Sequence, residues 1–218
     1  MNIKLVIFDM DGVVLDSERI ANIAWLDTAK ELGAVMTEED LRHIKGGNYV
    51  RTTRILSEKY GSDMAVKILD MKKKKQREIM ASEGGVKLKK GVVEILEFIK
   101  KVGLKCVIAT STVKESATRN LKFTGVYDYF DSFIFGDEVR KSKPDPEVFL
   151  KACAKVGVDK SQAVVIEDSV MGATAAFNGG IRCFVVEDTI KFTPEENKLA
   201  TMKFDSLIDV MNYLKDNR

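Results

Sequence analysis

The sequence has few of the residues that mark secreted or redox proteins. It contains three cysteines in 218 residues, Cys106, Cys153 and Cys183, and all three lie in apolar stretches. An odd number of cysteines in such surroundings is typical of reduced, buried thiols and not of a disulfide framework. We therefore expect a cytoplasmic protein whose thiols take no part in catalysis.

Long apolar runs and an excess of one charge are also missing. The first apolar run stops at Asp9, too early for a signal peptide, and later runs fall short of the roughly 20 residues of a membrane span. The 35 basic and 33 acidic residues leave a net charge of +2, which predicts no basic footprint for nucleic acid. Neither a membrane nor a nucleic acid is expected as a partner.

From residue 86 onward, strand-like and helix-like segments alternate with short joins. The segments "LKCVIAT", "AVVIED" and "IRCFVVED" read as strands, as does "LVIF" near the start. Continuous apolar strands that alternate with helices are typical of an α/β fold, in which helices cover both faces of a parallel sheet. The length is sufficient to bury roughly 70% of the unfolded surface, so no disulfides are needed.

Residues 17 to about 83 interrupt this alternation with helix-like segments alone. We predict a core formed by residues 1–15 and 84–218, with an all-helical insertion over residues 16–83. Gly84 and Gly85, together with residues 14–17, are the predicted two-stranded hinge.

Four consecutive lysines, Lys72 to Lys75, allow two interpretations. They could bind phosphate, or they could form a solvated helix surface. Four consecutive residues point around a whole helical turn, which favours the solvated surface.

Polar residues stand at the carboxyl ends of three predicted strands. In order along the chain they are Asp9 and Asp11, Thr110 and Ser111, and Glu167 and Asp168. Ligands of open parallel sheets bind outside the carboxyl ends of the strands. We therefore expect these residues to converge on one site.

Four carboxylates in one crevice would raise each other's pKa unless a cation were present. Mg²⁺ is the usual cation where a few carboxylates handle phosphate. Asp9 and Asp168 are the candidate side-chain ligands.

The same crevice is predicted to hold an anion. Thr110 and Ser111 precede a helix-like segment, whose N-terminal N–H groups favour anions. Thr112 and Glu115 have the spacing of a capping box. Lys143 follows the strand "FIF", after which the chain turns back towards the same sheet edge. An anion site, a divalent cation and a lysine together indicate phosphoryl transfer.

Phosphate-monoester hydrolysis is so slow that enzymes accelerate it by up to ~10²¹-fold. A carboxylate nucleophile splits the reaction into two easier steps, and Asp9 is the candidate. Asp11 is the candidate general acid and base, because alternation along an extended chain places it on the same side as Asp9.

These segments resemble the four motifs of the haloacid dehalogenase superfamily, phosphatase branch. The matching stretches, in chain order, are "DMDGVVLDS", "ATST", "KSKPDP" and "EDSVMGATAA". The resemblance implies a Rossmann-like core with a helical cap that closes on the substrate. It also implies the following roles: Asp9 as nucleophile and metal ligand, Asp11 as acid/base with its carbonyl on Mg²⁺, Thr110 and Lys143 on the phosphoryl oxygens, Asp168 as metal ligand, and Glu167 as ligand or support.

The relatives that the chain resembles most are the beta-phosphoglucomutase-like proteins, which include mutases and simple phosphatases. Mutases carry a histidine where this chain has Ala21, and the one histidine here is His43, for which a structural role is expected. The loop "HIKGGNY" resembles the substrate-specificity loop of the cap. This resemblance implies that Lys45 and Gly46 contact the substrate, although an ordinary turn between helices fits equally well.

Together these observations predict a monomeric, Mg²⁺-dependent phosphatase that hydrolyses a small phosphate ester, such as a sugar phosphate, through an aspartyl phosphate. A sugar phosphate mutase and a non-catalytic phospho-accepting or binding relative stay open as alternatives. Asp11 and the helical insertion favour turnover over the last of these.

Overall fold

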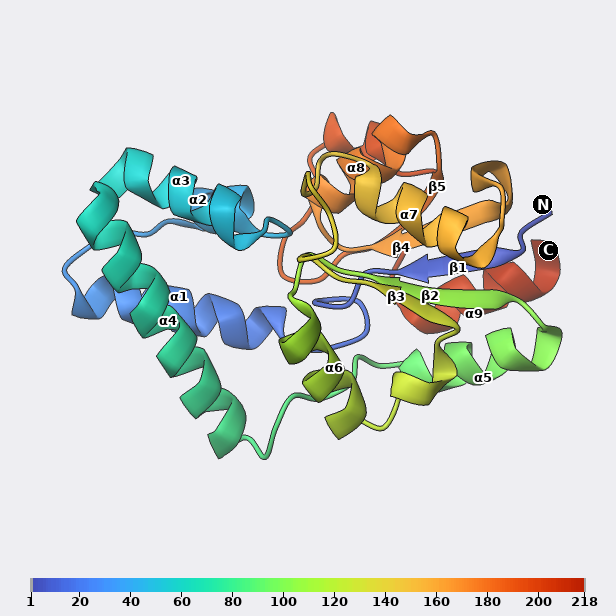
Figure 1. Cartoon of the computed structure of the whole chain (residues 1–218), viewed down its shortest axis with the longest axis horizontal. Helices are drawn as coiled ribbons and strands as arrows, with labels where there is room; N and C mark the ends of the chain where they lie inside the picture. Colours follow the sequence, from blue (N-terminus) through green and yellow to red (C-terminus); the bar gives the residue numbers. More distant parts are fainter. Residues whose placement is uncertain (1, 218) are drawn as a thin grey trace.

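The computed structural model describes residues 2–217 and shows a six-stranded parallel sheet with a helical segment to one side (Figure 1). The strand order is β3-β2-β1-β4-β5-β6. The strands are β1 (Leu5–Phe8), β2 (Lys105–Ala109), β3 (Ser132–Ile134), β4 (Ala163–Glu167), β5 (Arg182–Val186) and β6 (Met202–Phe204). The predicted α/β fold is confirmed, and β6 is an additional strand that the sequence pattern did not reveal.

The strands β1, β2, β4 and β5 alternate their side chains between two hydrophobic clusters, one on each face of the sheet. In β1, Val6 and Phe8 face one cluster, while Leu5 and Ile7 face the other. The first cluster is covered by α5 (Val92–Val102), α6 (Lys114–Phe123) and α9 (Leu207–Asn217), and the second by α7 (Glu147–Val156) and α8 (Val170–Gly179). Because both faces are buried, the central strands read as continuous apolar runs.

The elements between β1 and α5 are all helices, as predicted, and we call this group of helices the helical insertion. It consists of α1 (Glu18–Glu31), α2 (Glu38–Ile44), α3 (Tyr49–Tyr60) and α4 (Ser62–Ser82). It has its own buried cluster, which includes Trp25, Leu56 and Ile68. The insertion lies beside the end of the sheet that faces left in Figure 1. Its treatment as a separate domain with bounds 16–83 stays a prediction.

Two short extended segments, which are not among the six strands of the sheet, connect the helical insertion to the core. The N–H of Asp16 donates to the carbonyl of Lys87 at 2.9 Å, and the N–H of Lys89 donates to the carbonyl of Val14 at 3.0 Å. The pairing expected at Gly84 and Gly85 therefore lies a few residues later. The two glycines instead turn the chain out of α4 with positive φ angles.

Two further expectations concern the cysteines and possible membrane-spanning helices. Cys106, Cys153 and Cys183 are free and buried, as predicted. Within residues 2–217, none of the helices combines the length and the apolar character that crossing a bilayer demands.

Candidate active site

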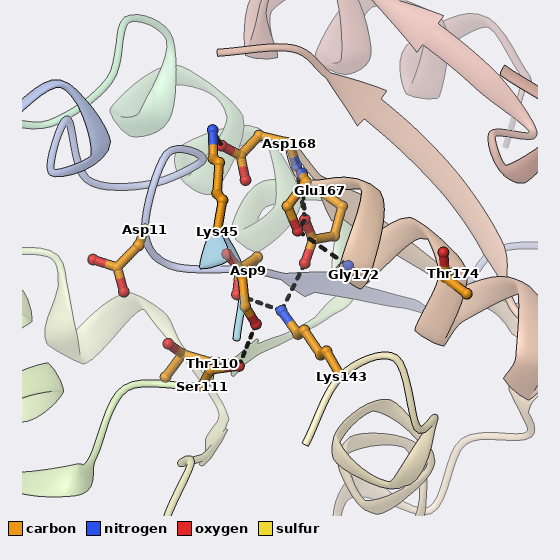
Figure 2. A network of polar contacts seen from close by, with 12 residues as sticks. Asp9, Asp11, Lys45, Thr110, Ser111, Lys143, Glu167, Asp168, Gly172 and Thr174 are labelled. Atoms are coloured by element: carbon orange, nitrogen blue, oxygen red, sulfur yellow. Dashed lines mark hydrogen bonds and ion pairs between the residues drawn. The ribbon is translucent and has the colours of Figure 1, made fainter. Parts of the chain in front are cut away.

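Three neighbouring strands of the sheet end side by side, and polar residues at their ends lie close together (Figure 2). Phe8 in β1 pairs with Ile108 in β2 and with Ile166 in β4. Asp9 follows Phe8 directly, and the residues after β2 and β4 come next to it. The parallel register thus produces the convergence that the sequence predicts.

Three carboxylates form a buried acidic cluster at this point. Asp9, Glu167 and Asp168 each offer an oxygen within 4.8 Å of the others, and all three are buried. Burial raises the pKa of Asp9 to about 8, although Lys143 opposes the shift, and it raises the pKa of Asp168 well above its ordinary value. Such a cluster is stable in its ionised form only when cations neutralise it.

Lys143 is one of those cations, and its position confirms that the loop after β3 returns to the sheet edge. Its Nζ lies 2.7 Å from Asp9 Oδ1 and 2.6 Å from Glu167 Oε1, and the side chain is buried against the ring of Phe149. Burial alone would lower the pKa of Lys143, but the two carboxylates raise it. The lysine therefore stays charged.

Both carboxylate oxygens of Glu167 have hydrogen-bond partners. Oε1 meets Lys143, while Oε2 accepts hydrogen bonds of 2.9 Å from the N–H groups of Asp168 and Ser169 and from the Ser169 hydroxyl. A Cβ on Gly172 would lie 1.6 Å from Oε1, so only glycine lets α8 approach this closely. With both oxygens engaged, Glu167 is better suited to position its neighbours than to bind a metal directly.

Asp168 differs from Glu167 in the hydrogen bonding of its carboxylate. Within residues 2–217 neither of its buried carboxylate oxygens accepts a hydrogen bond. The ammonium of Lys45 lies 2.7 Å from Oδ2 as an ion pair without hydrogen-bond geometry, and Oδ1 has no such neighbour. A buried carboxylate with a free oxygen beside Asp9 fits the donor set of a hard divalent cation. The acidic cluster therefore has the composition of a Mg²⁺ site.

Asp11 lies at the mouth of the site and points away from the acidic cluster in Figure 2. Its Oδ1 accepts from the Ser17 hydroxyl at 2.6 Å, and its Oδ2 accepts from the Thr112 hydroxyl at 2.7 Å. The capping box predicted for Thr112 is wrong, because α6 begins at Lys114 and the hydroxyl is used to orient Asp11 instead. The predicted Mg²⁺ contact of Asp11 through its carbonyl stays a prediction.

Thr110 and Ser111 end the second strand as predicted. Thr110 is buried, and its Oγ1 accepts from the N–H of Thr112 at 3.0 Å. The Ser111 hydroxyl donates to the carbonyl of Gly46 at 2.9 Å and so joins the core to the helical insertion. A Cβ on Gly46 would lie 2.7 Å from the Ser169 hydroxyl, which explains glycine at this contact.

A cavity of about 760 Å³ lies between the insertion and the core, and Asp9, Asp11, Lys143 and Asp168 open into it. Its volume is in the range of small-molecule sites. Lys45 and Gly46 line it as well, so their proposed substrate contact is geometrically possible and stays a prediction.

The interpretation of the lysine run, Lys72 to Lys75, holds only in part. Lys72 and Lys73 line the cavity, while Lys74 lies near Glu78 and Lys75 near Glu31. Lys73 and Lys74 are exposed, in line with the predicted solvated surface, and Lys72 is half-buried. Lys72 Nζ lies 4.8 Å from the centre of the Trp25 ring and donates to Gln76 Oε1 at 2.6 Å. Burial lowers the pKa of Lys72.

Sequence reasoning missed Ser17 and Thr112 as the partners of Asp11. It also missed the ion pair of Lys45 with Asp168, since nothing in the local pattern joins residues so far apart. His43, by contrast, is an exposed residue 3.4 Å from Glu39 and is not one of the residues that line the cavity.

Comparison with known proteins agrees with this geometry. The family of haloacid dehalogenase-like hydrolases matches residues 6–186. A phosphorylated carbohydrates phosphatase of Thermotoga maritima is 33% identical over 220 residues, which cover 95% of this chain and 98% of that protein.

Two solved structures share the fold over nearly their whole length. CbbY from Rhodobacter sphaeroides, in complex with phosphate, has a TM-score of 0.74 at 25% identity and covers 95% of this chain and 96% of its own. A beta-phosphoglucomutase from Clostridium difficile has a TM-score of 0.80 at 22% identity, over 98% and 96% of the two chains. From the matched residues and the identity to the Thermotoga protein, the chain belongs to the haloacid dehalogenase-like hydrolase family.

Proposed function

We propose that the protein is a Mg²⁺-dependent phosphatase that hydrolyses a small phosphorylated carbohydrate through an aspartyl phosphate on Asp9. The observation that carries the proposal is the buried group of Asp9, Lys143 and Asp168 at the floor of a cavity large enough for a sugar phosphate. The similarity to a phosphorylated carbohydrates phosphatase supports the substrate class.

In this mechanism Asp9 Oδ attacks the phosphorus, and the bond to the leaving oxygen of the sugar breaks. Asp11 donates a proton to that oxygen and then accepts one from the water that hydrolyses the aspartyl phosphate. Lys143 and Thr110 hold the phosphoryl oxygens, with Ser111 beside them.

Asp9, Asp168 and the Asp11 carbonyl would hold Mg²⁺, and Glu167 would position them. When bound, the metal neutralises charge on the phosphoryl group and on the carboxylates. Lys45 and Gly46 would contact the substrate from the helical insertion, which acts as a cap. A monomer and a cytoplasmic location remain predictions.

A sugar phosphate mutase is the second candidate, and Ala21 argues against it. Ala21 lines the cavity, where the mutases that the chain resembles carry a histidine. No histidine occurs among the described residues that line the cavity, so no imidazole is available there to move protons on a bound sugar.

The test is phosphate release from a panel of sugar phosphates with Mg²⁺, repeated with a chelator. We expect release that the chelator abolishes and that Asp9→Asn abolishes, with a phosphorylated Asp9 found by mass spectrometry after acid quench. Asp63→Asn, an exposed carboxylate on α4, is the matched control and keeps full activity. Release of no phosphate from any compound, or an adduct on another residue, would overturn the proposal.

A further inference from the structure

The loop after α2 is the part of the helical insertion that reaches the acidic cluster. The Lys45 ammonium lies 2.7 Å from Asp168 Oδ2 and 3.1 Å from Thr189 Oγ1, and only 4% of the Lys45 side chain is exposed. The carbonyl of the next residue, Gly46, accepts a hydrogen bond of 2.9 Å from the Ser111 hydroxyl. The loop is therefore attached to the core both by a buried side chain and by its backbone.

The ion pair of Lys45 with Asp168 is buried but incompletely formed. It lacks hydrogen-bond geometry, and Asp168 Oδ1 accepts no hydrogen bond from the described part of the chain. Lys143 differs, since its ammonium donates to Asp9 at 2.7 Å and to Glu167 at 2.6 Å. In Figure 2 the two lysines approach the acidic cluster from opposite sides. Of the two cations, Lys45 is therefore the one that is more easily replaced.

The charges of the acidic cluster do not accommodate both Lys45 and a divalent cation. Asp9, Glu167 and Asp168 carry one negative charge each when they are ionised. Lys143 and Mg²⁺ together neutralise all three, which would leave the Lys45 ammonium buried there without an opposing charge. A buried charge without a partner is costly. Lys45 and Mg²⁺ are thus alternative partners of Asp168.

Two other carboxylates lie near Lys45, and neither ties it to the core. Burial alone would lower the pKa of Lys45, but Asp168, Glu18 and Asp188 raise it, so the ammonium stays charged. Asp188 is paired with Lys89 at 2.6 Å. Glu18 belongs to α1 of the helical insertion, so it can move together with Lys45. The attachment of Lys45 to the core therefore depends on Asp168.

We propose that Lys45 takes the place of the divalent cation in the metal-free protein, and that it leaves Asp168 when the cation binds. The proposal rests on the metal site of the function proposed above and adds a conformational consequence. A cation that binds only where Lys45 is absent shifts the protein toward the state in which the loop after α2 is released from the core. The cavity between the insertion and the core then opens.

The first experiment measures how fast each lysine of the parent protein is labelled by reductive methylation, with and without Mg²⁺, using peptide mass spectrometry. We expect Mg²⁺ to raise the labelling rate of Lys45 several-fold, because its ammonium leaves the buried ion pair. The exposed Lys59 and the buried Lys143 are internal references whose rates should stay the same.

Calorimetric titration with Mg²⁺ distinguishes the failure of this proposal from the failure of the proposed function. Mg²⁺ binding without faster labelling of Lys45 would overturn the exchange and leave the metal-dependent phosphatase intact. Absence of Mg²⁺ binding would overturn both.

Arg42→Gln is the matched control, because Arg42 also joins the insertion to the core but has its partners outside the acidic cluster. It pairs with Glu196 and donates to the carbonyl of Lys191 at 2.8 Å. Mg²⁺ should raise the labelling of Lys45 in this variant as it does in the parent. Loss of the response in Arg42→Gln would contradict a direct exchange at Asp168.

A second measurement compares the Kd for Mg²⁺ of the parent with that of two variants. Lys45→Met should bind Mg²⁺ more tightly by about tenfold or more, because no ammonium has to be displaced from the buried carboxylate. Thr189→Val removes only the hydroxyl to which Lys45 donates, at an exposed position, and should tighten binding by a smaller factor even if Lys45→Met fails to fold. Equal or weaker Mg²⁺ binding by the variants would contradict the proposal.

Discussion

Lys45 Nζ, from the helical insertion, lies 2.7 Å from Asp168 Oδ2 in the core, and both side chains are buried. Lys45 also donates to Thr189 Oγ1 at 3.1 Å. The ion pair links the loop after α2 to the end of β4. Because we propose Asp168 as a metal ligand, Lys45 and a divalent cation both neutralise the same carboxylate.

Replacement of Lys45 by methionine should make the protein depend on the metal for stability. Without a divalent cation, Lys45→Met leaves Asp168 buried and unpaired, and removing one partner of a buried pair typically costs about 3–5 kcal/mol. Mg²⁺ neutralises the carboxylate and so restores part of that loss. Thermal unfolding with Mg²⁺ and with chelator should show a larger Mg²⁺-dependent gain in Tm for Lys45→Met than for the parent.

Lys59→Met provides the control for this measurement. Lys59 pairs with Asp40 on the surface of the insertion, and exposed pairs contribute about 1 kcal/mol or less. Its small loss should be the same with Mg²⁺ and with chelator. If Lys45→Met and the parent gain equally from Mg²⁺, the shared-carboxylate argument is wrong.

Replacement of Gly12 should disturb the proposed metal site through Asp168. It has a φ of +82°, and an added Cβ would lie 2.1 Å from Asp168 Oδ2. Gly12→Ala therefore pays the left-handed backbone cost of about 1–2 kcal/mol and also displaces Asp168. We expect the rate of phosphate release to fall by far more than the loss of folded protein would explain.

Gly33→Ala isolates the backbone cost. Gly33 has a φ of +68° at the end of α1, with nothing within 4 Å of an added Cβ. It should lose similar stability in chemical denaturation and keep its activity. Full activity in Gly12→Ala would show that Asp168 tolerates displacement.

The sequence predicts the floor of the site because parallel strands in one sheet bring their carboxyl ends to one edge. Asp9, Thr110 and Asp168 each stand directly at such an end, so chain order and strand pattern are enough to bring them together. Lys143 needed the additional inference that the loop after β3 turns back to this edge.

The walls of the site depend on contacts between distant segments, and local patterns do not encode them. Thr112 has the spacing of a capping box, but its hydroxyl finds Asp11 instead. The orientation of Lys72 depends on how α4 packs against α1, where Trp25 lies beneath the ammonium. For the same reason, the partners of Lys45 appear only in the folded chain.

Asp11→Asn tests the assignment of the general acid. Both oxygens of Asp11 accept hydrogen bonds from hydroxyls, and the amide that replaces the carboxyl group has no acidic proton to transfer to the leaving oxygen. We expect kcat for a sugar phosphate to fall by about 10²–10⁴-fold. The fall should be much smaller for an aryl phosphate, because its leaving group departs without protonation.

Asp16→Asn is the control on the same loop, where Asp16 pairs with the half-exposed Arg19 at 3.5 Å. It should leave both substrates unaffected. Equal losses for the sugar and aryl phosphates in Asp11→Asn would assign Asp11 a role other than proton transfer.

The buried state of Asp9 predicts how Mg²⁺ binding depends on pH. In the metal-free protein, burial raises the pKa of Asp9 from 3.8 to about 8, against the opposing effect of Lys143. A raised pKa in the folded state means that the contribution of this group to stability is fully present below 3.8 and is lost as the pH rises toward about 8. Mg²⁺ requires the ionised carboxylate, so it must displace the proton over this range.

The gain in Tm caused by Mg²⁺ should therefore increase as the pH rises from about 5 to about 8 and become level above that. Calorimetry in two buffers with different ionisation enthalpies would count the protons released on binding. Release should be larger near pH 6 than near pH 9, and Asp9→Asn should release fewer protons because Asp168 is then the main carboxylate to lose one. A Mg²⁺-dependent gain that is constant over this range would mean that Asp9 is already ionised beside Lys143 in the metal-free protein.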